Sequence, residues 1–307
     1  MRIALAQLNA TVGDIAGNTE RIVRAIGEAR AAGADRVVVP ELAVSGYPPR
    51  DLLLVEGFVR ACAAAAREIG ERATAGITAV IGTPLPVDKD DYSKGTANSV
   101  VVFRDGAYVD YYDKRLLPTY DVFDEDRYFE AGARACVFEV AGRKVGVAIC
   151  EDLWKGEDAG FGSRYADVGD PVAELTTRGA EVLVVPSASP FVVGKGAKHR
   201  AILRHHATRH GVWVASVNQV GGNDDLVFDG HACAVAPDGR MVAAAPGFDE
   251  HVLVFDVDDA APAVADPVET SSGERLVLDA LTVGVRDYLK SAEFSAVIGL
   301  SGGLIRR

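Results

Sequence analysis

The stretch Val145-Gly146-Val147-Ala148-Ile149-Cys150 is a short apolar run that ends on a thiol. Its length and its valine and isoleucine content are typical of a buried β-strand. Two other runs end on a charged residue: Val37-Val38-Val39-Pro40 precedes Glu41, and Val109–Asp113 precedes Lys114. In open α/β folds, functional sites gather beyond the carboxyl ends of the strands. The three strand ends can therefore converge on one site.

The segments around these runs alternate between strands and helices. Helices are expected over residues 19–32, with Asn18 as the cap, and over residues 56–72. Hairpins are expected around Asp105-Gly106 and around Ala141-Gly142-Arg143, because turn residues separate two strand-like runs at each place. The predicted fold class is therefore α/β, with sheets that crossover helices cover only in part.

The composition excludes several classes of protein. The chain has 307 residues, of which 49% are hydrophobic and 25% charged, a globular rather than a disordered composition. The 32 Lys and Arg against 44 Asp and Glu give a net charge of −12, which argues against nucleic acid as a partner. No apolar run is long enough to span a bilayer, and the first residues lack the pattern of a signal peptide. We therefore expect a cytoplasmic protein without a membrane partner.

The four cysteines, Cys62, Cys136, Cys150 and Cys233, lie far apart and form no CxxC pair, so neither disulfides nor a cysteine-based zinc site is expected. A thiol becomes a strong nucleophile once it is deprotonated. A carboxylate such as Glu41 can take the proton, and an ammonium such as Lys114 can stabilise both a thiolate and an oxyanion. Each residue alone is better explained as structural, but the joint pattern favours a catalytic site.

Three motifs resemble the catalytic motifs of the nitrilase superfamily and occur in the same order. They are Val39–Tyr47 (VPELAVSGY), Tyr112–Pro118 (YDKRLLP) and Val147–Trp154 (VAICEDLW), and the resemblance covers residues 1–257. It implies a four-layer α-β-β-α sandwich and a carbon-nitrogen hydrolase. It further implies that Glu41 is the general base, that Lys114 stabilises the oxyanion together with the backbone N–H of Glu151, and that Cys150 is the nucleophile.

Longer patterns resemble the glutaminase domain of glutamine-dependent NAD(+) synthetases; they are Ser45–Leu53, Leu117–Phe129 and Val217–Gly230. The resemblance implies hydrolysis of L-glutamine through a cysteine thioester, without a cofactor, in a homo-oligomer. The ammonia is then expected to reach a synthetase domain or subunit, where it displaces AMP from NaAD-adenylate. The implied site roles are these: Glu125 orients Lys114 and Cys150, Tyr47 and Tyr120 line the pocket, and Glu151 and Ser187 contact the two ends of glutamine, with Ser189 as the alternative to Ser187.

The last part of the sequence is expected to be a separate unit. Residues 258–273 are rich in Ala, Pro, Asp and Ser and are predicted to be a linker. Residues 274–307 resemble the start of the synthetase domain, with a helix over residues 274–290, a strand over Ala296–Leu300 and a phosphate-binding loop that begins at Ser301, Gly302 and Gly303. The loop pattern of that family is not continued by Leu304–Arg307. The synthetase step, with its ATP and Mg²⁺, is therefore not expected of this chain.

Several alternatives stay open beside this interpretation. Gly299–Gly303 also satisfies G-x-S-x-G, the nucleophile turn of α/β-hydrolases, but no acidic residue or histidine follows it in the sequence. His199, His205, His206 and His210 could bind a metal, but the basic residues between them favour a solvated helix face and no metal. The two alternative functions are hydrolysis of another small amide and a non-catalytic fragment or assembly scaffold.

Overall fold

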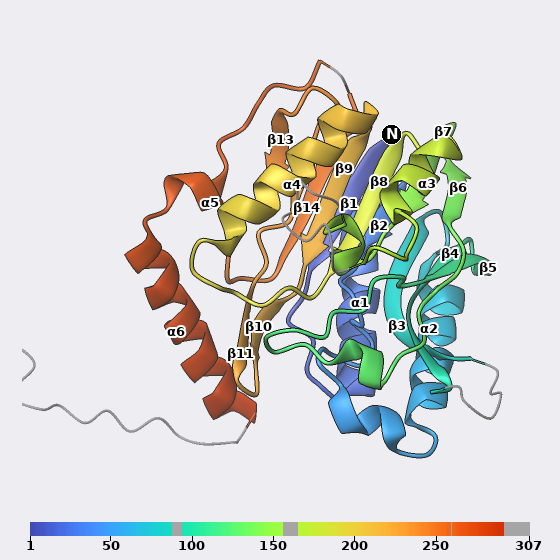
Figure 1. Ribbon diagram of the computed structural model, residues 1–307. Helices are drawn as coiled ribbons and strands as arrows, with labels where there is room; N and C mark the ends of the chain where they lie inside the picture. The colour runs from blue at the N-terminus through green and yellow to red at the C-terminus, as the bar shows by residue number, and fades with distance from the viewer. Residues whose placement is uncertain (88–93, 156–164, 259, 292–307) are drawn as a thin grey trace, which may run out of the picture.

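Two six-stranded sheets packed face to face form the centre of the protein (Figure 1). The structure, a computed structural model, describes residues 1–87, 94–155, 165–258 and 260–291. The first sheet has, in spatial order, β14 (His251–Asp256), β1 (Arg2–Gln7), β2 (Arg36–Val38), β3 (Thr78–Pro86), β4 (Thr96–Arg104) and β5 (Ala107–Asp113). The second has β13 (Met241–Ala244), β12 (Cys233–Val235), β9 (Trp213–Asn218), β8 (Val182–Ser187), β7 (Arg143–Val147) and β6 (Cys136–Val140).

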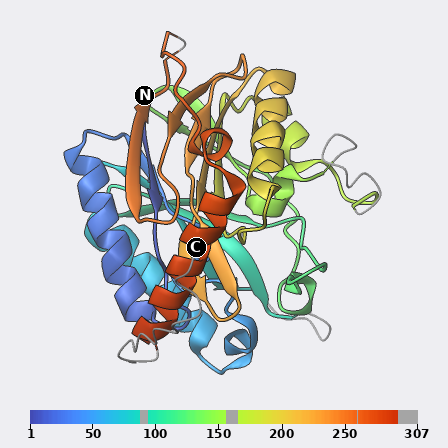
Figure 2. The same ribbon diagram turned by 90° about the vertical axis from the view of Figure 1, so that its left-hand side faces the viewer.

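Helices cover the outer face of each sheet. The helices are α1 (Ile15–Ala31) and α2 (Phe58–Ala73) on the first sheet, and α3 (Pro171–Thr177) and α4 (Lys195–His210) on the second. Figure 2 shows the layers edge-on, with α1 on one side, α4 on the other and the sheets between them. The four-layer α-β-β-α sandwich expected from the sequence is therefore confirmed.

Strand β1 shows how the sequence specifies these layers. Ile3 and Leu5 point into the core between the two sheets, while Ala4 and Ala6 point toward the helices α1 and α2. Alternate residues of a strand face opposite sides of the sheet, so a strand that is buried on both faces reads as a continuous apolar run. The core strands of both sheets are parallel: β1 pairs with β2 and β2 with β3, and β7 pairs with β8 and β8 with β9.

The start of α1 differs from the prediction. The cap is Asp14, whose Oδ1 accepts a hydrogen bond from Gly17 N at 2.8 Å. Asn18 lies inside the first turn and is buried, and its side chain accepts from Thr11 N at 2.9 Å and donates to Thr11 O at 2.8 Å. Asn18 as the cap was wrong because its side chain binds the preceding loop rather than the free N–H groups of the helix.

The predicted hairpins are present, and a further one near residues 220–229 was not predicted. β4 and β5 turn at Asp105 and Gly106, which both have positive φ angles of 52° and 79°. β6 and β7 turn at Ala141 and Gly142. The additional hairpin joins β10 (Val220–Asn223) to β11 (Leu226–Asp229). Its strands are four residues long and contain two glycines, so they lack the apolar alternation that marks a strand in sequence.

Helix α4 also differs in part from the prediction of a solvated basic face. Arg200 and His206 are buried. Arg200 donates from Nε to Asp266 Oδ2 at 2.9 Å, and Nε2 of His206 lies 2.8 Å from the carbonyl oxygen of Leu153. These two side chains anchor the helix to its surroundings, so the expectation of a solvated face is wrong for them.

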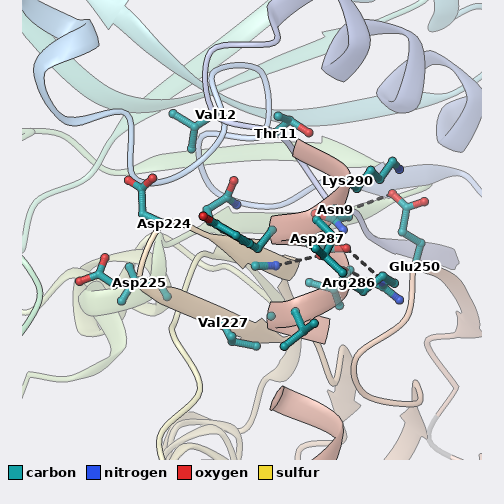
Figure 3. Close-up of a pocket in the computed structure, with 18 of the residues that line it drawn as sticks. Asn9, Thr11, Val12, Asp224, Asp225, Val227, Glu250, Arg286, Asp287 and Lys290 are labelled. Carbon is teal, nitrogen blue, oxygen red and sulfur yellow. Dashed lines mark hydrogen bonds and ion pairs between the residues drawn. The ribbon is translucent and has the colours of Figure 1, made fainter. Parts of the chain in front are cut away.

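The segment after the second sheet contains two helices, α5 (Pro267–Thr270) and α6 (Gly273–Ser291). Asp266, within the predicted linker, is buried and accepts from Val268 N at 3.0 Å, which caps α5. α6 lies across the hairpin β10–β11 (Figure 1), where Asp287 accepts from Asn9 Nδ2 at 2.8 Å and from Gly222 N at 2.9 Å. Figure 3 shows Asp287 beside Asn9 in the cleft of about 1410 Å³ between α6 and the hairpin.

Two features predicted for the last residues of the sequence fall outside the described residues. They are the strand Ala296–Leu300 and the phosphate-binding loop with Ser301, Gly302 and Gly303. Among the residues that the structure describes, no helix combines the length and the apolar character needed to cross a bilayer.

Candidate active site

Glu41 and Lys114 form a buried ion pair at one edge of the first sheet. Glu41 lies three residues after the end of β2, and Lys114 directly follows β5. The Nζ atom of Lys114 lies 2.7 Å from Oε1 of Glu41, and each side chain is 1% exposed. Two charges that are removed from water in this way need each other and further hydrogen bonds to offset the cost of burial.

A glycine in β3 makes room for the loop that carries Glu41. A Cβ atom on Gly82 would lie 2.2 Å from the carbonyl oxygen of Pro40 and 2.9 Å from the Cα of Glu41. These distances are far inside van der Waals contact, so only glycine allows this close approach of two backbones. Val44 N then donates to Gly82 O at 3.1 Å, which holds the loop against β3.

Both carboxylate oxygens of Glu41 have further donors. Asn98 of β4 donates from Nδ2 to Oε1 at 2.7 Å, and the backbone N–H of Ala188 donates to Oε2 at 2.9 Å. Ala188 follows β8 in the second sheet, so the orientation of Glu41 depends on both sheets. Neither Asn98 nor Ala188 was predicted from the sequence, because the contacts span 57 and 147 residues.

Cys150 enters the site from the second sheet. It begins the short 3-10 helix η3 (Cys150–Leu153), is 9% exposed and has a φ angle of +43°. Burial, and after it the charge of Glu41, raises the pKa of the Cys150 thiol, whereas the charge of Lys114 lowers it. The thiol, the carboxylate and the ammonium therefore act on one another, and the resting thiol is protonated at neutral pH.

A second carboxylate, Glu125, faces Lys114. It lies in the 3-10 helix η2 (Glu125–Arg127), and its Oε1 accepts from Lys114 Nζ and from the Tyr47 hydroxyl, each at 2.8 Å. Burial raises the pKa of Glu125 to about 7, although Lys114 opposes this shift. Burial alone would lower the pKa of Lys114, but Glu125 and Glu41 together raise it well above its usual value. Lys114 is therefore an ammonium ion at neutral pH.

Glu151 lies next to the thiol and is held by two tyrosines. Tyr120 donates to Oε2 at 2.9 Å, and Tyr165 donates to Oε1 at 2.8 Å. Glu151 is 3% exposed. The contact with Tyr165 was not predicted, because Tyr165 follows Glu151 by 14 residues, in a stretch without a recognised motif.

The two serine candidates differ in their surroundings. Ser187 ends β8 and is fully buried, and among the described residues its hydroxyl has no hydrogen-bond partner. Ser189 is half-buried, and its backbone is tied to Asn218, which accepts from Ser189 N at 2.7 Å and donates to Ser189 O at 2.9 Å. The unused hydroxyl of Ser187 is available to a ligand, and both residues stay candidates.

Lys195, at the start of α4, is a cation near the thiol that the sequence did not reveal. Its Nζ lies 5.6 Å from the centre of the Phe123 ring, and its charge lowers the pKa of Cys150. The local sequence around Lys195 carries no motif that marks it, because it is a lysine at the start of a helix that also contains Lys198.

The other three cysteines are buried free thiols. Burial raises the pKa of Cys62 to about 12, and burial is also the main reason for the raised pKa of Cys136 and of Cys233. Of the four thiols, all within the described part of the chain, Cys150 is the one that interacts with Glu41 and Lys114. The same described part holds no cluster of three His, Cys, Asp or Glu side chains arranged for a metal ion.

Two curated proteins are similar in sequence to this chain over almost its whole length. The glutamine-dependent NAD(+) synthetase of Synechocystis sp. is 41% identical over 309 residues, which is 98% of this chain and 55% of that protein. The corresponding protein of Xylella fastidiosa strain 9a5c is 43% identical over 313 residues, 99% of this chain and 54% of that protein. The chain thus spans about half the length of the curated relatives that it matches.

Two solved structures share the fold of this chain over most of its length. The glutamine-dependent NAD+ synthetase from Acinetobacter baumannii, solved with ADP, has a TM-score of 0.80 at 32% identity and covers 96% of this chain and 53% of its own. The amidase NitN from Nesterenkonia sp. AN1 has a TM-score of 0.70 at 25% identity and covers 90% of this chain and 98% of its own. The family model of carbon-nitrogen hydrolases matches residues 2–265. Because this match extends over most of the sequence, the chain belongs to the carbon-nitrogen hydrolase family.

Proposed function

We propose that this carbon-nitrogen hydrolase cleaves the side-chain amide of L-glutamine and releases ammonia. The observation that carries the proposal is the buried ion pair of Glu41 and Lys114 beside the Cys150 thiol. The raised pKa of the thiol means that a base must remove its proton when substrate is bound. Glu41 is the carboxylate in position to do so, because Ala188 and Asn98 fix its orientation.

The reaction follows from these positions. The Sγ of Cys150 attacks the amide carbon while Glu41 takes the thiol proton. The Lys114 ammonium and the backbone N–H of Glu151 stabilise the resulting oxyanion. Glu41 then returns the proton to the departing nitrogen, which leaves as ammonia, and a γ-glutamyl thioester remains on Cys150. Water, deprotonated by Glu41, attacks the thioester carbon, and glutamate leaves as the thiol is restored.

Glu125 supports this chemistry through Lys114. Its carboxylate is the second partner of the ammonium, and the Tyr47 hydroxyl holds that carboxylate in place. An ammonium between two fixed carboxylates loses the freedom to turn away from the substrate oxygen. We propose that Glu125 is an accessory residue for this reason.

The charges around the thiol favour an amino acid as the substrate. Glu151 offers a buried carboxylate to an α-ammonium group, and Tyr120 and Tyr165 orient it. Lys195 also acts on the thiol, and it lines a pocket with the half-buried Ser189, so we propose it as the cation for the α-carboxylate. A pair of opposite charges near the reactive thiol suits a zwitterion better than a plain amide.

We propose that the ammonia serves a synthetase domain or subunit that makes NAD(+) from NaAD. The support is that the relatives from Synechocystis sp. and Xylella fastidiosa are glutamine-dependent NAD(+) synthetases. The proposed hydrolysis itself uses only groups of this chain and water. ATP and Mg²⁺ would belong to the synthetase step.

The test is ammonia release from L-glutamine. Wild type should release ammonia, Cys150→Ala should release none, and Cys62→Ala should match wild type, because the Cys62 thiol is buried away from the pair. Intact mass after brief exposure to a diazoketone analogue of glutamine should show one adduct, on Cys150. Release from propionamide but not from glutamine would support hydrolysis of another small amide. No release and no adduct with any amide would support the scaffold alternative.

A further inference from the structure

Asp152 links the two strand ends that carry Lys114 and Cys150. It is fully buried, and both of its carboxylate oxygens are occupied. Oδ1 accepts from the backbone N–H groups of Arg115 at 3.1 Å and of Leu116 at 2.9 Å. Oδ2 accepts from Ile149 N at 2.9 Å and from the Tyr112 hydroxyl at 2.8 Å. A carboxylate that accepts four hydrogen bonds at once has a fixed position and orientation.

The four groups that donate to Asp152 lie close in sequence to Lys114 and Cys150. Tyr112 precedes Lys114 by two positions, and the N–H groups of Arg115 and Leu116 belong to the two residues that follow it. On the other side, Ile149 directly precedes Cys150. Lys114 leaves the first sheet at β5, and Cys150 follows β7 in the second sheet. One side chain therefore joins the two sheets at the point where their reactive groups meet.

The backbone at Cys150 needs such support. Its positive φ angle of 43° is unfavourable for a residue with a side chain, and a strained backbone persists only where its surroundings hold it. Asp152 closes the turn in both directions, because its N–H donates to Ile149 O at 2.9 Å while its carboxylate accepts from Ile149 N.

We propose that Asp152 is a positioning residue that sets the place of the Cys150 thiol relative to the Lys114 ammonium. Its carboxylate is saturated by protein donors, so it takes no part in binding substrate or in moving a proton. The proposal rests on the proposed cysteine hydrolase, and it predicts that the loss of Asp152 lowers the rate of the chemical step rather than the binding of substrate.

The principal variant is Asp152→Asn, which keeps the size of the side chain. If the new NH₂ group faces the N–H groups of Arg115 and Leu116, both of those bonds are lost. If it faces Ile149 N and the Tyr112 hydroxyl, the bond to Ile149 N is lost, because only the hydroxyl can accept. We expect kcat for ammonia release to fall by about 10²-fold with KM within about twofold, because small displacements of reacting groups cost rate rather than affinity. We also expect slower alkylation of Cys150 by iodoacetamide, followed by peptide mass spectrometry.

Two further variants separate positioning from stability. Tyr112→Phe removes one of the four bonds and should lower kcat by about threefold to tenfold, the worth of one hydrogen bond. Asp266→Asn changes another buried carboxylate, which binds Arg200 and caps α5 outside the site. It should lower Tm without changing kcat per folded molecule.

The outcomes are distinct. If Asp152→Asn lowers only Tm, with kcat and the alkylation rate unchanged, Asp152 is merely structural and the proposal is overturned. An equal loss of kcat in Asp266→Asn would overturn it as well. If Asp152→Asn does not fold, kcat and the alkylation rate of Tyr112→Phe test the proposal instead. If wild type releases no ammonia from glutamine, the proposed function fails, whereas the alkylation rates still test Asp152.

Discussion

The backbone N–H of Ala188, directly after β8 of the second sheet, donates at 2.9 Å to Oε2 of Glu41, which follows β2 of the first sheet. Both residues are buried. This contact directs the other oxygen of Glu41 toward Lys114 and Asn98, which lie 2.7 Å away. The carboxylate that we propose as the base is thus oriented by the packing of one sheet on the other.

Replacing Glu41 by Gln should remove the base and keep the shape of the side chain. We expect kcat for ammonia release to fall by about 10²-fold to 10⁴-fold, the usual contribution of a general base. Binding should change little, which a KM or a competition assay with glutamate can measure.

Glu68→Gln is the matched control, because Glu68 is an exposed glutamate on α2 that pairs with Arg72 on the same helix. It should retain wild-type kcat. Full activity in Glu41→Gln would exclude Glu41 as the base.

Glu125→Gln should change the dependence of stability on pH. The pKa of Glu125 is raised by burial to about 7 from its usual 4.5, so the folded state binds this proton more tightly than the unfolded chain does. The resulting stabilisation is present below about pH 4.5 and is lost as the pH rises through about 7. Across this pH range, the free energy of unfolding of wild type should fall by on the order of 3 kcal/mol relative to that of Glu125→Gln.

Urea unfolding of both proteins at about pH 4.5 and about pH 8 measures this difference. Titrating groups that do not interact with Glu125 are common to both chains, so their contributions cancel in the comparison. Parallel losses of stability in the two proteins would show that the carboxyl of Glu125 has the same pKa in the folded and the unfolded state.

The two charged side chains near the thiol, Glu151 and Lys195, should discriminate between substrates. Lys195→Met and Glu151→Gln each remove one charge, while Glu151→Gln keeps the backbone N–H that we propose for the oxyanion. We expect KM for glutamine to rise by about 10-fold to 100-fold, the worth of a hydrogen bond to a charged group. The kcat/KM for propionamide, which has no charged ends, should stay within about twofold of wild type.

Lys198→Met is the control for Lys195→Met, because Lys198 lies on the same helix but faces Trp154. It should leave both substrates unaffected. Equal losses of kcat/KM for glutamine and propionamide in Lys195→Met would argue against a carboxylate contact.

Asp287→Ala should loosen α6 from the rest of the protein. The carboxylate accepts from Asn9 Nδ2 and from Gly222 N, and its loss leaves a half-buried backbone N–H without its partner (Figure 3). We expect a loss of about 1–3 kcal/mol in the free energy of unfolding. Limited proteolysis should cut within residues 273–291 sooner than in wild type.

Asp279→Ala provides the comparison on the same helix, since Asp279 pairs with the exposed Arg275. Such surface pairs contribute about 0–1 kcal/mol, so the proteolysis rate should stay near that of wild type. Identical digestion of Asp287→Ala and wild type would mean that apolar contacts alone hold α6.

The sequence by itself determined the local structure and the identity of the reactive groups. Apolar runs and turn residues act over a few neighbours, so strands such as Cys136–Val140 and the turn at Asp105 and Gly106 could be predicted from short windows. The same runs showed which residues stand at strand ends. The local pattern gave a wrong prediction at Asn18. An asparagine can cap a helix or bind a neighbouring loop, and Asn18 binds the preceding loop.

Only the tertiary structure decided what surrounds those groups. Ala188 reaches Glu41 across 147 residues, and Asp152 reaches Leu116 across 36, through the packing of one sheet on the other. No local pattern encodes such contacts, because they depend on how the strands of two sheets are ordered and paired in space. The sequence therefore predicted which residues form the candidate site, whereas their protonation and orientation depend on burial and partners that only the folded chain provides.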